Sequence, residues 1–406
     1  MTIHRINITD TGELSGALSS LGADRRSLPY FDNKRAVECF FVPDADVRAA
    51  NVMKQEMLSL GGDAAVNAHA VDCKTEKSSV LLFGSVKQLS QFADKLKTMP
   101  WWGFPKISAE VAEALANIRP RTRKTVLPCG AELEFGRRTM IMGIINLTDD
   151  SFYAASRTGG SVAPAAARAV KMAAEGADIL DLGAESTRPG SERVPEEQEL
   201  SRMTESVKAI RRELPQMPLS IDTTRESVAR AALAEGADII NDVSGLTFEP
   251  KLAAAAASNG AMLVLMHMRG TPATMSSLCD YNDLLAEMTA FFDDGIAKAA
   301  SLGLAKDKII LDPGIGFAKT YEQNLFLLKH PEAFRTFGLP LLVGASRKGS
   351  VGKATDSPDP DGRLEGTLAI SALCAWGGID VVRVHDVREN KKAVMMAEAI
   401  RGSRYA

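Results

Sequence analysis

The sequence lacks several features that would assign it to other classes of protein. No apolar run reaches the ~18 residues that a membrane-spanning helix needs, and the segment Met1–Asp10 is polar, without the apolar core of a secretory signal. The five cysteines are scattered and never paired as Cys-x-x-Cys, which argues against a disulfide framework. These absences predict buried, reduced thiols in a cytoplasmic protein with no membrane partner.

An excess of one charge is also missing. The 48 Lys and Arg residues face 51 Asp and Glu residues, so the formal net charge is −3 at pH 7. Such a balance gives no bulk attraction to nucleic acid, and any phosphate group must be held at a local site. The sequence shows no zinc-ligand spacing, no Ser-His-Asp arrangement and no complete dinucleotide or P-loop motif.

What the sequence does contain is a series of eight short apolar runs, each of which stops at a polar or charged side chain. The runs are Met140–Asn146, Ile179–Glu185, Pro218–Asp222, Asp238–Asp242, Met262–His267, Ile309–Asp312, Leu339–Lys348 and Val381–Asp386. Stretches of helical composition separate most of them. This pattern predicts an α/β fold, a (β/α)₈ TIM barrel with a functional site at the carboxyl ends of its strands.

The chain is longer than one such barrel, which takes about 250 residues. Residues 1–105 predict a small α+β domain of unknown role, with the order β-α-β-β-α and a first helix that begins at Asp44. Residues 106–123 predict a linker helix and a basic linker. Residues 124–406 predict the catalytic barrel, entered through a β-hairpin near residues 125–135 that would cover the bottom of the barrel.

The side chains that end the runs favour a flat, nitrogen-rich ligand. Asp222 and Asp312 can accept from ring N–H and amino groups, and the amide of Asn241 can both accept and donate. With Lys348, these are groups suited to the edge of a pterin or guanine-like ring. An alternative for Asp222 is that it only caps the helix that follows it.

The side chains at other strand ends suit an anionic ligand and a metal cation. Arg383 and His385 alternate along the last strand, so both point the same way, at the end of the barrel that usually binds phosphate. The hydroxyl-rich loop that contains Arg188 also suits an anion, although it could be a turn with a surface arginine. Asn146 could ligate a hard cation or bind a phosphate. His267 is expected to be structural.

Seven ordered motifs resemble those of the dihydropteroate synthases, a family of pterin-binding TIM barrels. They span about residues 124–402 and are Met142–Phe152, Asp181–Gly190, Ile221–Thr223, Ile240–Asp242, Asp312–Lys319, Ser346–Lys348 and Arg383–Asp386. The resemblance implies a Mg²⁺-dependent transferase of folate biosynthesis. It would condense (7,8-dihydropterin-6-yl)methyl diphosphate with 4-aminobenzoate to give 7,8-dihydropteroate and diphosphate. The Ala-rich segment Leu368–Trp376 could form the interface of a homodimer.

The resemblance also implies roles for individual residues. The groups that would hold the pterin are Asp222, Asn241, Asp312 and Lys348. Those that would hold the diphosphate are Arg188, Arg383 and His385. Those that would border the 4-aminobenzoate are Thr187, Pro189, Phe317 and Ser346. Those that would act in catalysis are Asn146 (at the metal), Arg188, Lys348, Arg383 and His385.

The chain departs from the family pattern in two places. Ala154 stands where the family often has an acidic residue near the reactive methylene, and Gly349 stands where some members have a serine for the aminobenzoate carboxylate. Two alternatives stay open. A corrinoid-dependent methyltetrahydrofolate methyltransferase would share the fold and pterin pocket, but it would have little use for Arg383 and His385. A non-catalytic pterin-binding scaffold is the other, and Ala154 is the argument for it.

Overall fold

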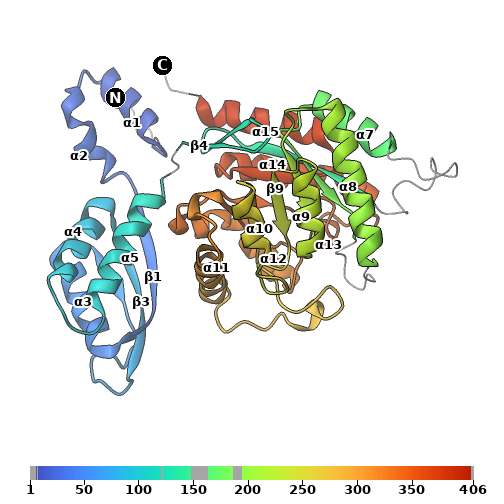
Figure 1. Ribbon diagram of the computed structural model, residues 1–406. Coiled ribbons are helices and arrows are strands. Elements are labelled where there is room, and N and C mark those ends of the chain that lie inside the picture. Colours follow the sequence, from blue (N-terminus) through green and yellow to red (C-terminus); the bar gives the residue numbers. More distant parts are fainter. Residues whose placement is uncertain (1–5, 7, 120–121, 148–162, 186–193, 404–406) are drawn as a thin grey trace. The chain divides into compact units, whose positions relative to one another are not determined.

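The computed structural model describes residue 6 and residues 8–119, 122–147, 163–185 and 194–403. The chain divides into two compact units, formed chiefly by residues 1–119 and by residues 120–401 (Figure 1). Among the described residues, no helix is long and apolar enough to cross a membrane.

The amino-terminal unit is an antiparallel sheet packed against three of its helices, which confirms the predicted α+β class. Its strands adjoin in the order β1 (Val37–Asp46), β3 (Lys77–Ser85) and β2 (Asp63–Ala65). Its helices are α1 (Thr11–Ser20), α2 (Leu28–Asp32), α3 (Val47–Ser59), α4 (Val86–Lys97) and α5 (Phe104–Asn117), with a 3₁₀ turn at Arg25–Ser27. Val80 and Leu82 of β3 pack with Met53, Phe92 and Phe104 from the three helices α3, α4 and α5.

Some details of this unit differ from the sequence prediction. Helix α3 is capped by Asp46, whose side chain accepts from the Arg48 N–H, and not by Asp44. Asp44 has a φ of +46° and lies in a bulge of β1, where a short polar side chain tolerates the left-handed conformation. Helices α1 and α2 were not predicted.

The second unit is a closed (β/α)₈ barrel, as predicted. Its eight parallel strands adjoin in the order β11-β10-β9-β8-β7-β6-β13-β12, and a parallel bridge between Leu311 and Leu341 joins the two ends of this series. The strands are β6 (Met140–Asn146), β7 (Ile179–Gly183), β8 (Leu219–Asp222), β9 (Ile239–Asp242), β10 (Met262–Met266), β11 (Ile309–Asp312), β12 (Leu342–Val343) and β13 (Val381–Val384).

Helices lie between the strands and around the barrel (Figure 1). They are α7 (Ala163–Ala174), α8 (Glu196–Glu213), α9 (Glu226–Ala234), α10 (Leu252–Ser258), α11 (Leu284–Ser301), α12 (Tyr321–Lys329), α13 (Gly349–Ala354), α14 (Leu364–Trp376) and α15 (Val387–Gly402). Short 3₁₀ turns occur at Met275–Ser277, Lys306–Lys308, Pro331–Phe337 and Pro360–Arg363.

A β-hairpin closes the amino-terminal end of the barrel, which confirms the predicted cover. Strands β4 (Arg123–Val126) and β5 (Glu132–Phe135) pair in antiparallel fashion. The hairpin side chains Leu133 and Phe135 share one buried cluster with Ile179 and other residues near the starts of the barrel strands. The floor of the barrel is therefore apolar and sealed.

Within the barrel, several strands pass from an apolar to a polar inward side chain over two residues. The lower members belong to the buried floor cluster and are Ile179, Ile239, Ile310 and Val381. Two positions later, where a strand side chain faces the same way, stand Asp181, Asn241, Asp312 and Arg383. The alternation of the strands thus places one polar layer above the apolar floor.

The cysteines correct one expectation. All five are free, but only Cys374 is buried, and Cys39 and Cys73 are exposed. Cys39 alternates along β1 with Phe40 and Val42, which pack toward the helices, so its side chain faces away from them. Cys73 lies in a turn with a φ of +54°.

Candidate active site

Arg383 lies across two carboxylates in the polar layer of the barrel. Its Nε is 2.6 Å from Asp181 Oδ2, and its Nη2 is 2.8 Å from Asp222 Oδ2. Burial alone would lower the pKa of the guanidinium, but Asp181 and Asp222 hold the pKa of Arg383 above its usual value. Arg383 of β13 is therefore charged and held by side chains of two other strands, β7 and β8.

Asp181 is a site residue that the strand ends did not single out. Its Oδ2 accepts from Asn241 Nδ2 at 3.1 Å as well as from Arg383. Its Oδ1 is buried and has no hydrogen-bond partner among the described residues. A buried carboxylate oxygen without a donor is unfavourable, so this atom is suited to a ligand N–H. Its place on β7, two residues after Ile179, is the signal that could have found it.

Asp222 faces the barrel interior and does not cap the next helix. The residue at the cap of α9 is Arg225, and the carboxylate that accepts from the first helical N–H, that of Glu226, belongs to Glu249. Burial raises the pKa of Asp222 to about 7, with Arg383 opposing this shift and the neighbouring Asp181 adding to it. Without a ligand, Asp222 is therefore a carboxyl group close to its titration point at neutral pH.

Asp312, at the end of β11, and Lys348, in the loop after β12, carry opposite charges and interact with each other. Asp312 Oδ1 accepts from the Gly314 N–H at 2.7 Å, and burial raises the pKa of Asp312 while Lys348 opposes the shift. Lys348 Nζ donates to the carbonyl of Ile315 and lies 4.6 Å from the centre of the Phe317 ring. Burial lowers the pKa of Lys348 to about 8, with Asp312 opposing.

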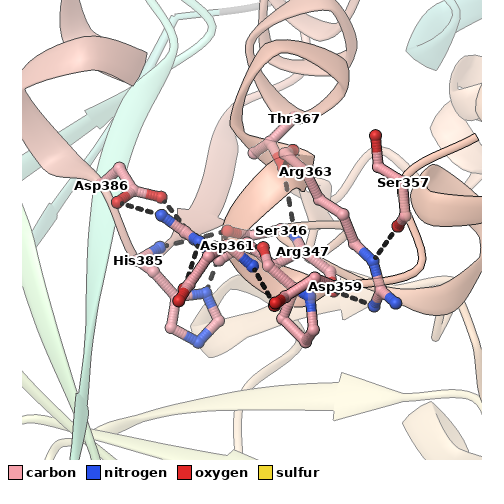
Figure 2. Close-up of polar contacts among 10 residues, drawn as sticks. Ser346, Arg347, Ser357, Asp359, Asp361, Arg363, Thr367, His385 and Asp386 are labelled. Atoms are coloured by element: carbon pink, nitrogen blue, oxygen red, sulfur yellow. Dashed lines mark hydrogen bonds and ion pairs between the residues drawn. The ribbon is translucent and has the colours of Figure 1, made fainter. Parts of the chain in front are cut away.

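Ser346 and His385 join the loops after β12 and β13 (Figure 2). Ser346 Oγ accepts from the His385 backbone N–H at 3.2 Å and lies 3.0 Å from His385 Nδ1. Which of these two side-chain atoms donates depends on the tautomer of the ring. Burial and Arg383 lower the pKa of His385 to about 4, so the ring is neutral at neutral pH.

Lys319 and His267 form a buried anchor beneath the loop after β11. Lys319 Nζ lies 2.9 Å from His267 Nδ1, 3.1 Å from the Gly314 carbonyl and 2.9 Å from the Phe317 carbonyl. Burial and Lys319 lower the pKa of His267 to about 2, so the ring is a neutral acceptor. Gly314 has a φ of +67°, and a Cβ there would stand 2.1 Å from the His267 carbonyl. His267 is thus structural, as expected, and Lys319 is a partner that sequence reasoning missed.

Asn146 ends β6 beside Gly183 of β7 and is half-buried. No group of three or more His, Cys, Asp or Glu side chains suited to a metal ion occurs in the part of the chain that the structure describes. The predicted site residues Thr187, Arg188 and Pro189, and the departure at Ala154, lie outside the described residues.

The structure therefore gathers the polar strand ends at one end of a closed barrel whose other end is sealed. The sequence profile of the pterin binding enzymes matches residues 142–385, the span that holds this cluster. The dihydropteroate synthase of Synechocystis sp. is 48% identical over 278 residues, which cover 68% of this chain and 94% of that protein. This chain belongs to the dihydropteroate synthase family. Its members are transferases of folate synthesis.

Solved structures of dihydropteroate synthases share the fold. The Xanthomonas albilineans dihydropteroate synthase with 4-aminobenzoic acid is 37% identical and has a TM-score of 0.64, with 70% of this chain and all of that chain covered. A longer match is a probable bifunctional folylpolyglutamate synthase/dihydropteroate synthase of Haloferax volcanii, 33% identical over 412 residues. It covers 98% of this chain and 46% of that protein, so it takes in the amino-terminal unit as well.

Proposed function

We propose that this chain catalyses the dihydropteroate synthase reaction. The amino group of 4-aminobenzoate forms a C–N bond to the methylene of (7,8-dihydropterin-6-yl)methyl diphosphate, the C–O bond to the diphosphate breaks, and the nitrogen loses a proton. The observation that carries the proposal is the buried polar layer, which holds Asp181, Asp222 and Asp312 around Arg383.

A pterin suits this layer because the layer has more acceptors than donors. The carboxylates interact with Arg383, Lys348 and Lys319, but Lys319 Nζ donates to the loop carbonyls of Gly314 and Phe317, and Asp181 Oδ1 has no partner among the described residues. A neutral ring with several N–H and amino donors would supply the missing hydrogen bonds without adding a full charge. We assign Asp181 to the pterin site together with Asp222, Asn241, Asp312 and Lys348.

The same carboxylates can assist bond breaking. As the C–O bond lengthens, positive charge develops on the methylene and spreads into the electron-rich ring. Ionised Asp222 and Asp312 at the ring edge would stabilise that charge, because both are buried where solvent screens little. The weakly basic amine of 4-aminobenzoate then attacks a carbon that is already electrophilic, and no covalent enzyme nucleophile is required.

The diphosphate is assigned to Arg383 and His385, together with Arg188. Arg383 stays charged because two carboxylates hold it, and the neutral His385 ring would donate to the diphosphate through Nε2 in the tautomer whose Nδ1 accepts from Ser346. We assign the 4-aminobenzoate to the neighbouring loops, with Phe317 and Ser346 at its border and Thr187 and Pro189 from the loop after β7. Lys348 lies over the Phe317 ring and so connects the two substrate sites.

Mg²⁺ fits this donor set only as an ion that the substrate helps to hold. Asn146 offers one amide oxygen at the end of β6, and the described residues contain no cluster of carboxylates for a dedicated metal cage. Mg²⁺ in proteins often keeps several waters and binds through few protein ligands plus substrate phosphates. We propose that Asn146 and the diphosphate hold it, where it would neutralise charge on the leaving group.

We also propose a cytoplasmic homodimer. All five cysteines are free thiols, as in a reducing compartment. Helices α14 and α15 are joined by a hydrogen bond from Ser371 Oγ to Asn390 Oδ1. Together they expose large apolar side chains: Leu373, Trp376, Met395, Met396 and Ile400. Exposed apolar side chains on two helices joined in this way would suit an interface.

The experiment is a two-substrate assay on the full chain. Diphosphate release that requires both the pterin diphosphate and 4-aminobenzoate, with 7,8-dihydropteroate as the organic product, supports the proposal. Pterin binding without turnover would instead favour a scaffold. Methyl transfer from methyltetrahydrofolate to a corrinoid would favour the methyltransferase alternative.

A further inference from the structure

Arg347 stands between two candidate site residues, Ser346 and Lys348, in an unusual backbone conformation. Its φ of +57° lies in the left-handed region, where a long side chain is strained. Such a conformation persists when the surroundings hold it. Strand β12 does little to hold the backbone at Arg347, because the strand has two residues and pairs with β13 only at Leu342 and Val343.

The backbone of Arg347 is held on both sides. Its N–H donates to Thr367 Oγ1 at 3.1 Å, and its carbonyl accepts from Arg363 Nη1 at 2.9 Å. Arg363 is itself fixed, because its Nε donates to the Ser357 carbonyl at 3.0 Å. Figure 2 shows these partners gathered around Arg347.

The guanidinium of Arg347 points to the loop after β13. Its Nε and Nη2 each lie 2.8 Å from one carboxylate oxygen of Asp386, which makes a bidentate pair. Its Nη1 donates to the Pro360 carbonyl at 2.9 Å and lies 3.2 Å from Asp361 Oδ1. All three guanidinium nitrogens thus have protein partners, although sequence position alone would suggest that Arg347 binds phosphate.

We propose that Arg347 and Asp386 form a clasp that positions Ser346, Lys348 and His385 for the reaction. The two loops are joined twice in register, by Ser346 to His385 and by Arg347 to Asp386, the next residue along each chain segment. The clasp joins the two segments beyond Val343 and Val382, where the backbone pairing of β12 with β13 ends. Arg347 is therefore a positioning residue that touches no substrate. This inference rests on the proposed function for its kinetic readout only.

The test compares three single variants of the full chain. Arg347→Asn removes the guanidinium while keeping a residue that tolerates a positive φ, and Asp386→Asn removes the opposite charge. Asp361→Asn is the matched control, because Asp361 contacts the same guanidinium but its side chain is 96% exposed. We expect kcat/KM for both substrates to fall by about tenfold or more in the first two variants, as for the loss of a partly buried, bidentate charge pair, and to stay unchanged in Asp361→Asn.

The double variant Arg347→Asn/Asp386→Asn decides between the clasp and direct anion binding. A clasp predicts that the double variant is no worse than either single variant, because both remove one interaction. If Arg347 instead bound the diphosphate, Asp386→Asn would leave the kinetics intact or improve them by freeing the guanidinium. That result, or additive losses, would overturn the proposal.

A second readout is independent of turnover. The ring nitrogens of His385 report its hydrogen bond to Ser346, so ¹⁵N spectra of the folded variants should show a changed Nδ1 signal in Arg347→Asn and Asp386→Asn but not in Asp361→Asn. Unchanged His385 signals in all three would reject the clasp. If the wild-type chain makes no dihydropteroate, the proposed function is wrong. The spectra still test the clasp in that case, because they do not depend on turnover.

Discussion

Burial makes the charge of Asp222 sensitive to pH near neutrality. Its pKa is raised to about 7, mainly by burial, while that of the unfolded chain stays near 3.8. Between these values the folded state keeps a proton that the unfolded chain has lost, so the contribution of Asp222 to stability falls as the pH rises from about 4 to about 7. A ligand that donates N–H groups to the ionised carboxylate would reverse this penalty.

Pterin affinity should therefore fall as the pH is lowered. If only ionised Asp222 binds well, the ionised fraction drops from about 0.91 at pH 8 to about 0.09 at pH 6, and the Kd for a pterin should rise about tenfold. Calorimetric titrations of the wild-type chain and of Asp222→Asn check this, because the variant has no charge to lose and should show a flatter profile. A wild-type Kd that is constant over this range would exclude the role assigned to Asp222.

Asp312 offers a second prediction at the scale of one side chain. Asp312→Ala removes a ring-edge acceptor and leaves the pterin amino group without a partner, so pterin binding should weaken by roughly 2–4 kcal/mol. Asp307→Ala, an exposed carboxylate that precedes the same strand, is the control and should bind normally. Equal affinities for the wild type and Asp312→Ala, measured by equilibrium binding, would remove Asp312 from the site.

At the scale of elements, the hairpin β4–β5 is the part that seals the barrel. Phe135 is 2% exposed within the floor cluster, whereas Val126 of the same hairpin is 61% exposed. Phe135→Ala should lower the free energy of unfolding of the barrel by about 3–5 kcal/mol. Val126→Ala should change it by less than about 0.5 kcal/mol.

Denaturant unfolding of both hairpin variants, followed by a signal from the barrel unit, gives this comparison. Because the hairpin lies at the end of the barrel opposite the polar layer, the kcat/KM of Phe135→Ala should remain that of the wild type under native conditions. Equal stabilities for the two variants would show that the hairpin is not part of the barrel core.

The strands of the barrel and their ends were predicted well from the sequence, for a physical reason. Parallel strands buried on both faces are apolar until they reach the site, so the side chain that ends each run marks the strand end, as at Asp222, Asn241 and Asp312. The same reasoning passed over Asp181, because Leu182 and Gly183 continue its strand beyond it. Only the alternation of inward positions identifies a polar residue that lies within a run.

Other features depend on contacts that sequence position does not encode. A left-handed residue such as Arg347 sends its side chain in a direction that strand periodicity cannot give, so its pairing with Asp386 could not be predicted. The Lys319 anchor likewise depends on the closed loop around Gly314. Exposed Cys39 depends on which face of a small sheet the helices cover.

At the scale of the whole molecule, the proposed homodimer depends on α14 and α15. Trp376 is 53% exposed at the end of α14. Trp376→Glu would place a charge in the interface and should convert the dimer to a monomer in sedimentation experiments. Trp101→Glu, at a residue of the amino-terminal unit that is 59% exposed, is the control and should leave the mass unchanged. A wild-type chain that is monomeric at every concentration would reject the dimer.

The two units also differ in what the reaction requires of them. Every described candidate site residue, from Asn146 to His385, belongs to the barrel unit, and the Synechocystis relative aligns with only 68% of this chain. A shortened chain that begins at residue 121 should therefore keep the two-substrate reaction with unchanged KM values, because the barrel has its own core and its own polar layer. The amino-terminal unit, with Val37 69% and Phe41 50% exposed on β1, would then serve a purpose outside the chemistry. Kinetic constants of the full and shortened chains, measured side by side, decide this. A folded, shortened barrel with a raised KM for either substrate would instead give the amino-terminal unit a part in substrate binding.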